Sequence, residues 1–398
     1  MKLYKIVAFC LIIVLFADCN NHKKQKKIST KSSLTYAMLP PEEDLPKLSE
    51  GYKKNKKSQI ENFFTKNWAN DFENVSFLVA KNGQIIYEKY DGFADKENNI
   101  LNSPETPLHL ASISKVLTAS AILKLVDAQK LQLDDLLVTY FPKLPYKDVT
   151  IRMLLNHRSG IRKYGYFADD KKNWNKSENL TNAAILTILE TKNINQEYKT
   201  NTHFSYCNTN YVLLALLIEK VTGMKFKLAM KKIIFDPLEM KNTFVFDEQS
   251  RPEIATPSYK GNYVKYGFDF LDNVYGDKNI YSTPRDLLKF DLARNAPNFL
   301  SKKLFAQVFK GYSYESKGTK NYGLGIRLYE WETGQKLFYH NGWWHGNTSS
   351  YITLRKEKVV IIALSNKFTR KTYKLKCLSS LFGDYPFKME KDSIESGD

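Results

Sequence analysis

Hydrophobic positions change their spacing along the chain, and the change predicts strands near both ends. Residues 75–80 and 84–90 alternate between apolar and polar positions on either side of Asn82-Gly83, a dipeptide typical of two-residue β-hairpins. Short stretches rich in aromatic and β-branched residues return at 325–331, 336–340, 349–354 and 359–365. Turn residues such as Thr333-Gly334 separate them, so each stretch predicts a strand.

The region between these strands has apolar residues at helical spacing. It predicts helices at 112–129, 150–156, 182–191, 209–221, 226–234 and 284–293, with one more at 60–68 and one at 372–382. Strands at both ends with helices between them predict an α+β fold, in which one antiparallel sheet is formed by N- and C-terminal strands and flanked by helices. The middle of the chain then forms an inserted all-helical lobe, and a cleft follows between lobe and sheet.

The amino terminus predicts export to the cell envelope. Lys2 and Lys5 precede an apolar run at 6–17 that is too short to cross a bilayer as a stable helix, so residues 1–19 indicate a signal peptide. Cys19 ends a segment that resembles a bacterial lipoprotein signal, which implies a periplasm-facing protein with a lipid anchor in a membrane; the alternative is an uncleaved membrane anchor. Residues 20–58 are polar and lysine-rich, and we expect a flexible basic tether to a domain at 59–398.

Composition narrows the range of partners. The chain has 398 residues, of which 43% are hydrophobic, and this is enough for one large domain. A formal net charge of +18 favours anionic envelope polymers or lipid headgroups. Nucleic acid is not expected, because the protein is exported and its lysines are scattered. Outside the signal only Cys207 and Cys377 remain, so no disulfide framework is indicated.

Ser112 and Lys115 are the first candidate for chemistry. If Ser112 opens a helix, Lys115 lies one turn later on the same face, and an amine stands beside a hydroxyl. A serine hydroxyl needs such a base to act as a nucleophile at neutral pH. The run from Val116 to Val126 is almost continuously apolar, which predicts a buried helix. The alternative is a serine N-cap followed by a solvated lysine.

Two further segments carry candidate residues. In the loop before the helix at 209–221, Tyr206 and Asn208 are two positions apart and can face one cleft, with the tyrosine as base or relay. The alternative is a packed tyrosine with an asparagine helix cap. At the end of a predicted strand stands His340-Asn341-Gly342-Trp343, where the glycine lets a substrate backbone approach and the Trp343 amide can complete an oxyanion hole with that of Ser112.

The three segments, in this order, resemble the serine β-lactamase and penicillin-binding-protein superfamily. The most similar branch is the class C β-lactamase, D-alanyl-D-alanine carboxypeptidase and esterase-like group, with the pattern Ser-x-x-Lys, Tyr-x-Asn and Lys-or-His-x-Gly. Similarity covers residues 60–366 and includes His157-Arg158-Ser159-Gly160, Tyr281-Ser282-Thr283-Pro284 and Tyr322-Gly323-Leu324-Gly325.

The resemblance implies a role for each motif residue. Ser112 is the acylated nucleophile, Lys115 accepts its proton or tunes the pair, and Tyr206 acts as base toward the serine and later toward water. Asn208 binds Lys115 or the substrate amide. His340 stands where many members have lysine, and a neutral histidine offers only a hydrogen bond to a substrate carboxylate. This substitution favours peptidase-like or esterase-like members over an efficient β-lactamase.

The aromatic run after Gly342 and the remaining histidines affect the functional expectation less. The aromatic run at 343–345 is bulkier than the common glycine-rich version and is expected to narrow the cleft, unless it is only a structural corner. His109, His157 and His203 lack metal-ligand spacing, so neither a metal nor another cofactor is expected.

The resulting hypothesis is an exported serine hydrolase that acts through an acyl-enzyme on amide or ester bonds, as a D,D-peptidase or an esterase. Its substrate is a small molecule or peptide. The alternatives are a β-lactamase and, from another class, a catalytically silent envelope binding or sensor protein with the same fold. The pattern of residues leaves the oligomeric state open.

Overall fold

The structure is a computed structural model that describes residues 36, 38–41, 45–68, 73–247 and 255–389. The predicted signal peptide, with Cys19, and most of the predicted tether lie outside these residues. None of the helices in the described part of the chain is long and apolar enough to cross a membrane.

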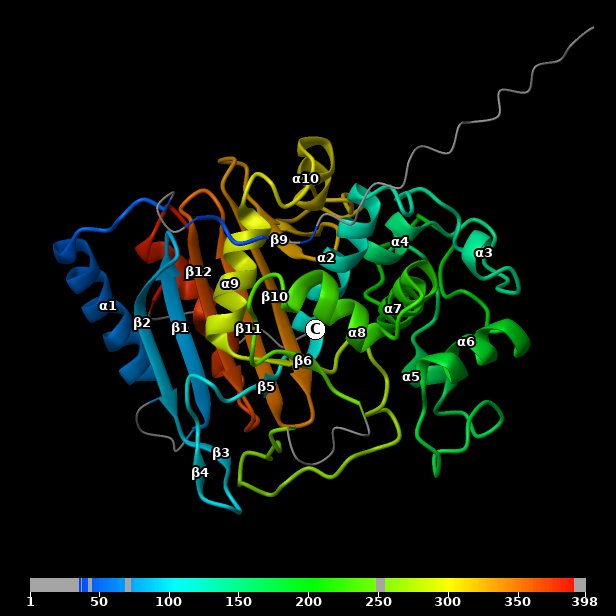
Figure 1. The fold of residues 1–398 in the computed structure, drawn as a ribbon, viewed down its shortest axis with the longest axis horizontal. Coiled ribbons are helices and arrows are strands. Elements are labelled where there is room, and N and C mark those ends of the chain that lie inside the picture. The colour runs from blue at the N-terminus through cyan, green and yellow to red at the C-terminus, as the bar shows by residue number, and fades with distance from the viewer. Residues whose placement is uncertain (1–35, 37, 42–44, 69–72, 248–254, 390–398) are drawn as a thin grey trace, which may run out of the picture. The chain divides into compact units, whose positions relative to one another are not determined.

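A seven-stranded antiparallel sheet forms the centre of the described domain, in the order β2-β1-β12-β11-β10-β9-β8 (Figure 1). The N-terminal strand β1 pairs with the C-terminal strand β12, which confirms a sheet built from both ends of the chain. The strands are β1 (Val75–Lys81), β2 (Gln84–Asp91), β8 (Lys320–Tyr322), β9 (Arg327–Glu330), β10 (Lys336–Trp344), β11 (Asn347–Leu354) and β12 (Val359–Ser365).

The predicted hairpin connects β1 and β2. Asn82 and Gly83 both have positive φ angles, 50° and 76°, as a two-residue turn of the twisted type requires. Strand β10 is longer than predicted and continues through Trp344, so the whole third motif lies on a strand.

Both faces of the sheet are buried, and alternate residues of β1 serve the two faces. Phe77 and Val79 pack in one hydrophobic cluster with helix α1 (Glu50–Trp68), whereas Leu78 and Ala80 belong to the cluster of the helical region. The helix predicted at 60–68 begins at Glu50, so residues 50–58 of the predicted tether are helical. The helix predicted at 372–382 is the 3₁₀ helix η5 (Lys371–Leu381), which packs against β11 and β12.

The predicted helical lobe is confirmed, and Figure 1 shows α3 to α7 gathered beside the sheet. Thr150, Thr181 and Thr283 each cap a helix, because their side-chain oxygens accept a hydrogen bond from a first-turn amide. The helices are α2 (Ser114–Asp127), α3 (Leu137–Tyr140), α4 (Ile151–Leu155), α5 (Tyr164–Phe167), α6 (Asn182–Thr191), α7 (Asn208–Thr222), α8 (Phe226–Met230), the π-helical η3 (Lys231–Phe235), α9 (Pro284–Asn295) and α10 (Lys302–Val308).

Two smaller sheets were not predicted. One pairs β3 (Phe93–Asp95) with β4 (Ile100–Leu101), and the other has the order β5-β7-β6, with β5 (Leu108–His109), β6 (Phe244–Val245) and β7 (Ile280–Ser282). The second sheet positions the candidate site, because β5 leads directly into the Ser112 turn and β7 follows the loop at 276–279. Cys207 and Cys377 are both buried free thiols.

Candidate active site

Ser112 lies in a tight turn rather than in the first turn of an α-helix. The residues Ala111–Ile113 form the 3₁₀ helix η2, and α2 begins only at Ser114. In a 3₁₀ helix, side chains three residues apart eclipse each other. Consistent with this, the ammonium nitrogen Nζ of Lys115 donates a hydrogen bond of 3.1 Å to Oγ of Ser112.

The residue before Ser112 has an unusual backbone conformation. Ala111 has a φ angle of 48°, in the left-handed region that costs a non-glycine residue about 1–3 kcal/mol. Its amide donates a hydrogen bond of 3.0 Å to Nδ1 of the buried His109, whose Nε2 lies 3.0 Å from Oδ1 of Asn279. These contacts hold the turn, so that Ser112 stays partly exposed between the buried Ala111 and Ile113.

Lys115 is completely buried, as predicted from the apolar helix around it. Its second acceptor is the main-chain oxygen of Asp277, at 2.7 Å. The pairing of β5 with β7 brings this carbonyl into place, and the amide of Leu110 continues that ladder by donating to the oxygen of Ile280. The ammonium group is therefore directed at both the serine and a fixed carbonyl.

The side chain of Asp277 belongs to a second hydrogen-bond network, next to the one formed by Ser112 and Lys115. The hydroxyl of Tyr164 donates to Oδ2 of Asp277 at 2.9 Å, and Nζ of the buried Lys278 donates to that same hydroxyl oxygen at 2.7 Å. The ammonium of Lys278 also lies 4.6 Å from the ring centroid of Trp344. This network fixes the loop whose carbonyl holds Lys115.

Tyr206 lies next to Lys115. The Lys115 ammonium is 5.1 Å from the centroid of the Tyr206 ring, the His157 ring is 4.4 Å from it, and the Arg327 guanidinium carbon is 4.8 Å from it. Asn208 is the first residue of α7, and its side-chain oxygen is buried without a hydrogen-bond partner among the described residues. Unsatisfied buried acceptors are rare, so this atom can take a donor from a substrate.

His340 is buried and close to Tyr206, with 6.2 Å between the ring centroids. Its Nδ1 lies 2.8 Å from the carbonyl oxygen of Asn341, which can only accept, so Nδ1 carries the proton and Nε2 accepts from the Tyr322 hydroxyl at 3.1 Å. Burial, and then the charges of Arg327 and Lys115, hold the pKa of His340 well below its usual 6.5. The imidazole is therefore neutral and has both nitrogens engaged.

Gly342 allows β10 to pass directly over the Ser112 turn. A Cβ atom at this position would lie 2.4 Å from the oxygen of Leu110 and 3.0 Å from Cβ of Ala111. The next residue, Trp343, pairs with Thr348 of β11 and has a side chain that is 59% exposed. The close approach is what the predicted oxyanion hole of the Ser112 and Trp343 amides requires, and that role stays a prediction.

The residues after Trp343 form a polar corner. The indole Nε1 of Trp344 donates to Asp272 at 2.7 Å, and His345 Nε2 lies 3.0 Å from the same carboxylate oxygen. Asp269, Asp272 and His345 place potential ligand atoms within 4.8 Å of one another, a group that the spacing of histidines did not predict. Because Asp272 is already hydrogen-bonded to two side chains, the corner is organised by the protein itself.

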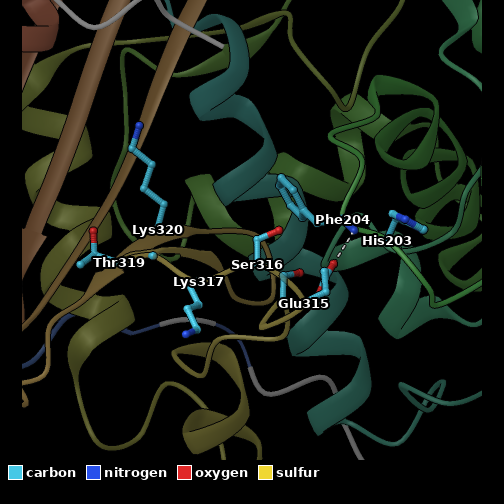
Figure 2. Close-up of a pocket in the computed structure, with 9 residues that line it drawn as sticks. His203, Phe204, Glu315, Ser316, Lys317, Thr319 and Lys320 are labelled. Carbon is cyan, nitrogen blue, oxygen red and sulfur yellow. Dashed lines mark hydrogen bonds between the residues drawn. The ribbon is translucent and has the colours of Figure 1, made fainter.

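Glu315, in the segment before β8, contacts both Arg158 and the loop that carries Tyr206. Arg158 donates from Nη1 to both carboxylate oxygens of Glu315, at 2.8 and 2.9 Å, and Glu315 also accepts from the amide of Phe204 at 2.8 Å. Figure 2 shows this last contact at the edge of a cavity of about 520 Å³, lined by Phe204, His203, Ser313 and residues 315–320. Glu315 carries no sequence signal, because its partners are far away in the chain.

Comparisons with known proteins agree with this architecture. The Beta-lactamase family model matches residues 60–377. Penicillin-binding protein 4* of Bacillus subtilis is 30% identical over 335 residues, which cover 79% of this chain and 73% of that protein. Teichoic acid D-alanine hydrolase of Staphylococcus aureus is 28% identical over 74% of this chain and 70% of its own length.

The solved structures include an octameric penicillin-binding protein homologue from Pyrococcus abyssi. It has a TM-score of 0.69 and 26% identity, and the match covers 84% of this chain and 78% of that one. The length of the family match and the 30% identity to a relative along most of both proteins lead to one conclusion: this chain belongs to the Beta-lactamase family, and it is a serine hydrolase that acts on amide or ester bonds.

Proposed function

We propose that the protein hydrolyses D-amino acyl ester or amide bonds of envelope molecules, through an acyl-enzyme on Ser112. The observation that carries this proposal is the contact of 3.1 Å between the buried Lys115 ammonium and the Ser112 hydroxyl, next to the Tyr206 ring. The teichoic acid D-alanine hydrolase among its relatives supports a D-alanyl ester as substrate.

The reaction proceeds in two halves. In the first, Ser112 Oγ attacks the acyl carbon while its proton passes to the neutral amine form of Lys115 or to the phenolate form of Tyr206, and the leaving alcohol or amine takes that proton as the scissile bond breaks. In the second, water attacks the acyl carbon and gives a proton to the Tyr206 phenolate. The bond between the acyl carbon and Ser112 Oγ then breaks, the carboxylic acid leaves, and Tyr206 returns the proton to Ser112 Oγ. The amides of Ser112 and Trp343 stabilise the oxyanion in both halves.

Among acyl substrates, we rank esters and peptides above β-lactams. A β-lactam antibiotic carries a carboxylate that a lysine at the third motif would hold, and here the buried neutral His340 stands in that position. The proposal therefore expects slow turnover of β-lactams, with acylation of Ser112 as the main outcome.

A covalent probe tests the nucleophile. A fluorophosphonate should add to Ser112, and hydrolysis of a nitrophenyl ester should disappear in Ser112→Ala. An adduct at another residue, or ester turnover that survives in Ser112→Ala, would contradict the mechanism. Comparing D-alanyl and L-alanyl esters then tests the substrate class, because the proposal expects a preference for the D form.

The proposal places the enzyme in the cell envelope. The signal at 1–19, lipidation at Cys19, the tether that follows and the domain at 59–398 stay predictions from the sequence pattern. Metabolic labelling with a fatty acid should mark the wild type and not Cys19→Ala. Absence of label from the wild type would contradict the lipid anchor without affecting the proposed reaction.

A further inference from the structure

The polar corner at the turn between β10 and β11 brings two carboxylates and an imidazole together. Nε2 of His345 lies 3.0 Å from Oδ1 of Asp272 and 3.9 Å from Oδ2 of Asp269. The potential ligand atoms of the three residues all lie within 4.8 Å of one another. Ligand atoms that share one zinc ion are about 3–4 Å apart, because each bond to the metal is about 2.0–2.2 Å long. The three side chains therefore need only a small adjustment to share one ion.

Asp272 is oriented by the protein and still has room for a further partner. Its side chain is 5% exposed, its Oδ1 accepts from the Trp344 indole at 2.7 Å, and its Oδ2 accepts from the Asp269 amide at 2.6 Å. Each carboxylate oxygen has two lone pairs, so each can take one partner more, and in this structure that partner is Nε2 of His345. A cation that replaces the shared proton leaves the other two hydrogen bonds intact. Metal-bound carboxylates are commonly oriented by such outer donors.

An unsatisfied acceptor lines the same place. Asn347 opens β11, two residues after His345, and is only 4% exposed. Its Nδ2 donates to the main-chain oxygen of Trp344 at 3.2 Å, whereas its Oδ1 has no hydrogen-bond partner among the described residues. Asp272, His345 and Asn347 line one cavity of about 390 Å³. A buried acceptor without a donor is unfavourable, and a water molecule bound to a cation in this cavity can supply the donor.

We propose that Asp269, Asp272 and His345 bind one divalent cation of the zinc type, with water from the cavity completing its coordination. One imidazole nitrogen with two carboxylate oxygens is a set that zinc accepts, whereas calcium prefers oxygen ligands alone. Binding needs Nε2 of His345 without its proton, which passes to solvent or to Nδ1. The spacing of histidines in the sequence did not indicate this site, because its ligands come from segments 73 positions apart.

The position of the site gives the cation a structural role. It joins the turn after β10 to the loop at 269–272, and the Trp344 side chain between these segments is also in contact with Lys278, whose ammonium lies 4.6 Å from its ring centroid. The cation therefore holds the end of the strand that carries the third motif. We expect it to raise thermal stability, and this inference goes beyond the proposed function and does not depend on it.

Titration calorimetry with Zn²⁺, after the protein has been treated with EDTA and the chelator removed, tests the site. The expected result is one bound ion per chain, with a Kd in the micromolar range or tighter. Excess Zn²⁺ should raise the melting temperature, because it binds the folded state, and EDTA should reverse the rise. Co²⁺ offers a spectroscopic readout, since its visible absorption changes when an imidazole nitrogen enters its coordination. Ca²⁺ at the same concentration should not displace Zn²⁺.

Two variants remove one ligand each and keep the local structure. His345→Asn removes the imidazole, and asparagine tolerates the positive φ angle of 50° at this position. Asp269→Asn removes the charge but keeps the oxygen that accepts from the Leu271 amide. Each should weaken Zn²⁺ binding by at least about tenfold, the loss that even an outer partner of a metal site causes. The control is His203→Asn, which removes an exposed histidine elsewhere and should leave affinity and stoichiometry unchanged.

The results decide the proposal without reference to catalysis. No binding of Zn²⁺ at micromolar concentrations overturns it, and so does an affinity that either ligand variant leaves unchanged. Preference for Ca²⁺ over Zn²⁺ would also overturn it, because that result excludes the imidazole as a ligand. The melting temperature of each variant in EDTA shows that it is folded. Ser112→Ala should bind Zn²⁺ as the wild type does, so a failure of the proposed function leaves this site standing.

Discussion

The Lys115 ammonium donates a hydrogen bond of 2.7 Å to the main-chain oxygen of Asp277, and it reaches Ser112 at 3.1 Å on its other side. Because the carbonyl acceptor cannot take a proton from the lysine, it orients the amine and leaves Ser112 as the group that exchanges one. The contact explains how a completely buried lysine is held in one position.

Lys115→Ala should lower kcat/KM for a nitrophenyl ester about 10²–10⁴-fold, the range that a positioned general base contributes. The matched control is Lys124→Ala, because Lys124 lies on the same helix, is equally buried and also donates to a main-chain oxygen, that of Phe299. Both variants should lose stability, and only Lys115→Ala should lose activity. Equal losses of activity would mean that Lys115 supports the fold alone.

Tyr206→Phe tests whether the phenol hydroxyl takes part in the reaction. The ring contacts with His157 and the two cations persist in the variant, so we expect KM to change little and kcat to fall about a hundredfold. Stopped-flow measurement of acylation and deacylation shows which half slows. As a control, Tyr211→Phe removes a buried hydroxyl that donates to Leu155, and its kcat should stay near the wild-type value. A normal kcat in Tyr206→Phe would reduce that residue to a packing role.

The spacing of apolar residues and the capping residues predicted individual strands and helices from the sequence. The β12 strand at 359–365 and the α6 helix at 182–191 match their predicted bounds, because the hydrophobic period and the capping residues depend only on neighbouring positions in the sequence. The turn at Ser112 was predicted as plain α-helix, since the positive φ of Ala111 depends on contacts with His109 from outside the helix. Apolar spacing was too weak to show that α1 begins at Glu50.

The candidate site likewise contains residues that the sequence could identify and others that only the structure could identify. Motif residues could be found because their side chains and spacing are characteristic. The Asp277 carbonyl could not, since every residue has one and only the β5–β7 pairing selects it. Arg327 lies within a predicted strand, but its proximity to Tyr206 results from the alignment of strands that only three-dimensional structure gives.

Glu315→Ala should slow the reaction without unfolding the protein. Glu315 fixes the amide of Phe204, two residues before Tyr206, so its loss should let the loop move and lower kcat about threefold to tenfold. The control is Asp134→Ala, which breaks a similar two-bond pair with Arg152, a residue of the nearby helix α4. Asp134 is exposed, so Asp134→Ala should shift the melting temperature only slightly, whereas Glu315→Ala takes the carboxylate away from the buried Arg158 and should lower it more. If both variants lose kcat equally, the loop contact is not the cause.

The buried carboxyl group of Asp291 should make the free energy of unfolding depend on pH. Burial raises its pKa from 3.8 to about 6, although hydrogen bonds from Tyr351 and Thr353 and the charge of Arg294 act in the opposite direction. Between pH 4 and 6 the folded protein therefore holds a proton that the unfolded chain has released. Because the folded state binds more protons in this window, the contribution of Asp291 to the free energy of unfolding falls as pH rises through it.

Asp291→Asn removes that dependence while keeping an acceptor for the Tyr351 hydroxyl, which donates to Oδ1 of Asp291. The difference in unfolding free energy between variant and wild type should move in favour of the variant as pH rises from 4 to 7, by at most about 3 kcal/mol for a shift of roughly two pKa units. Urea unfolding at a series of pH values measures this difference directly. Parallel curves for the two proteins would show that the carboxyl ionises inside the fold at no cost, which the burial of Asp291 argues against.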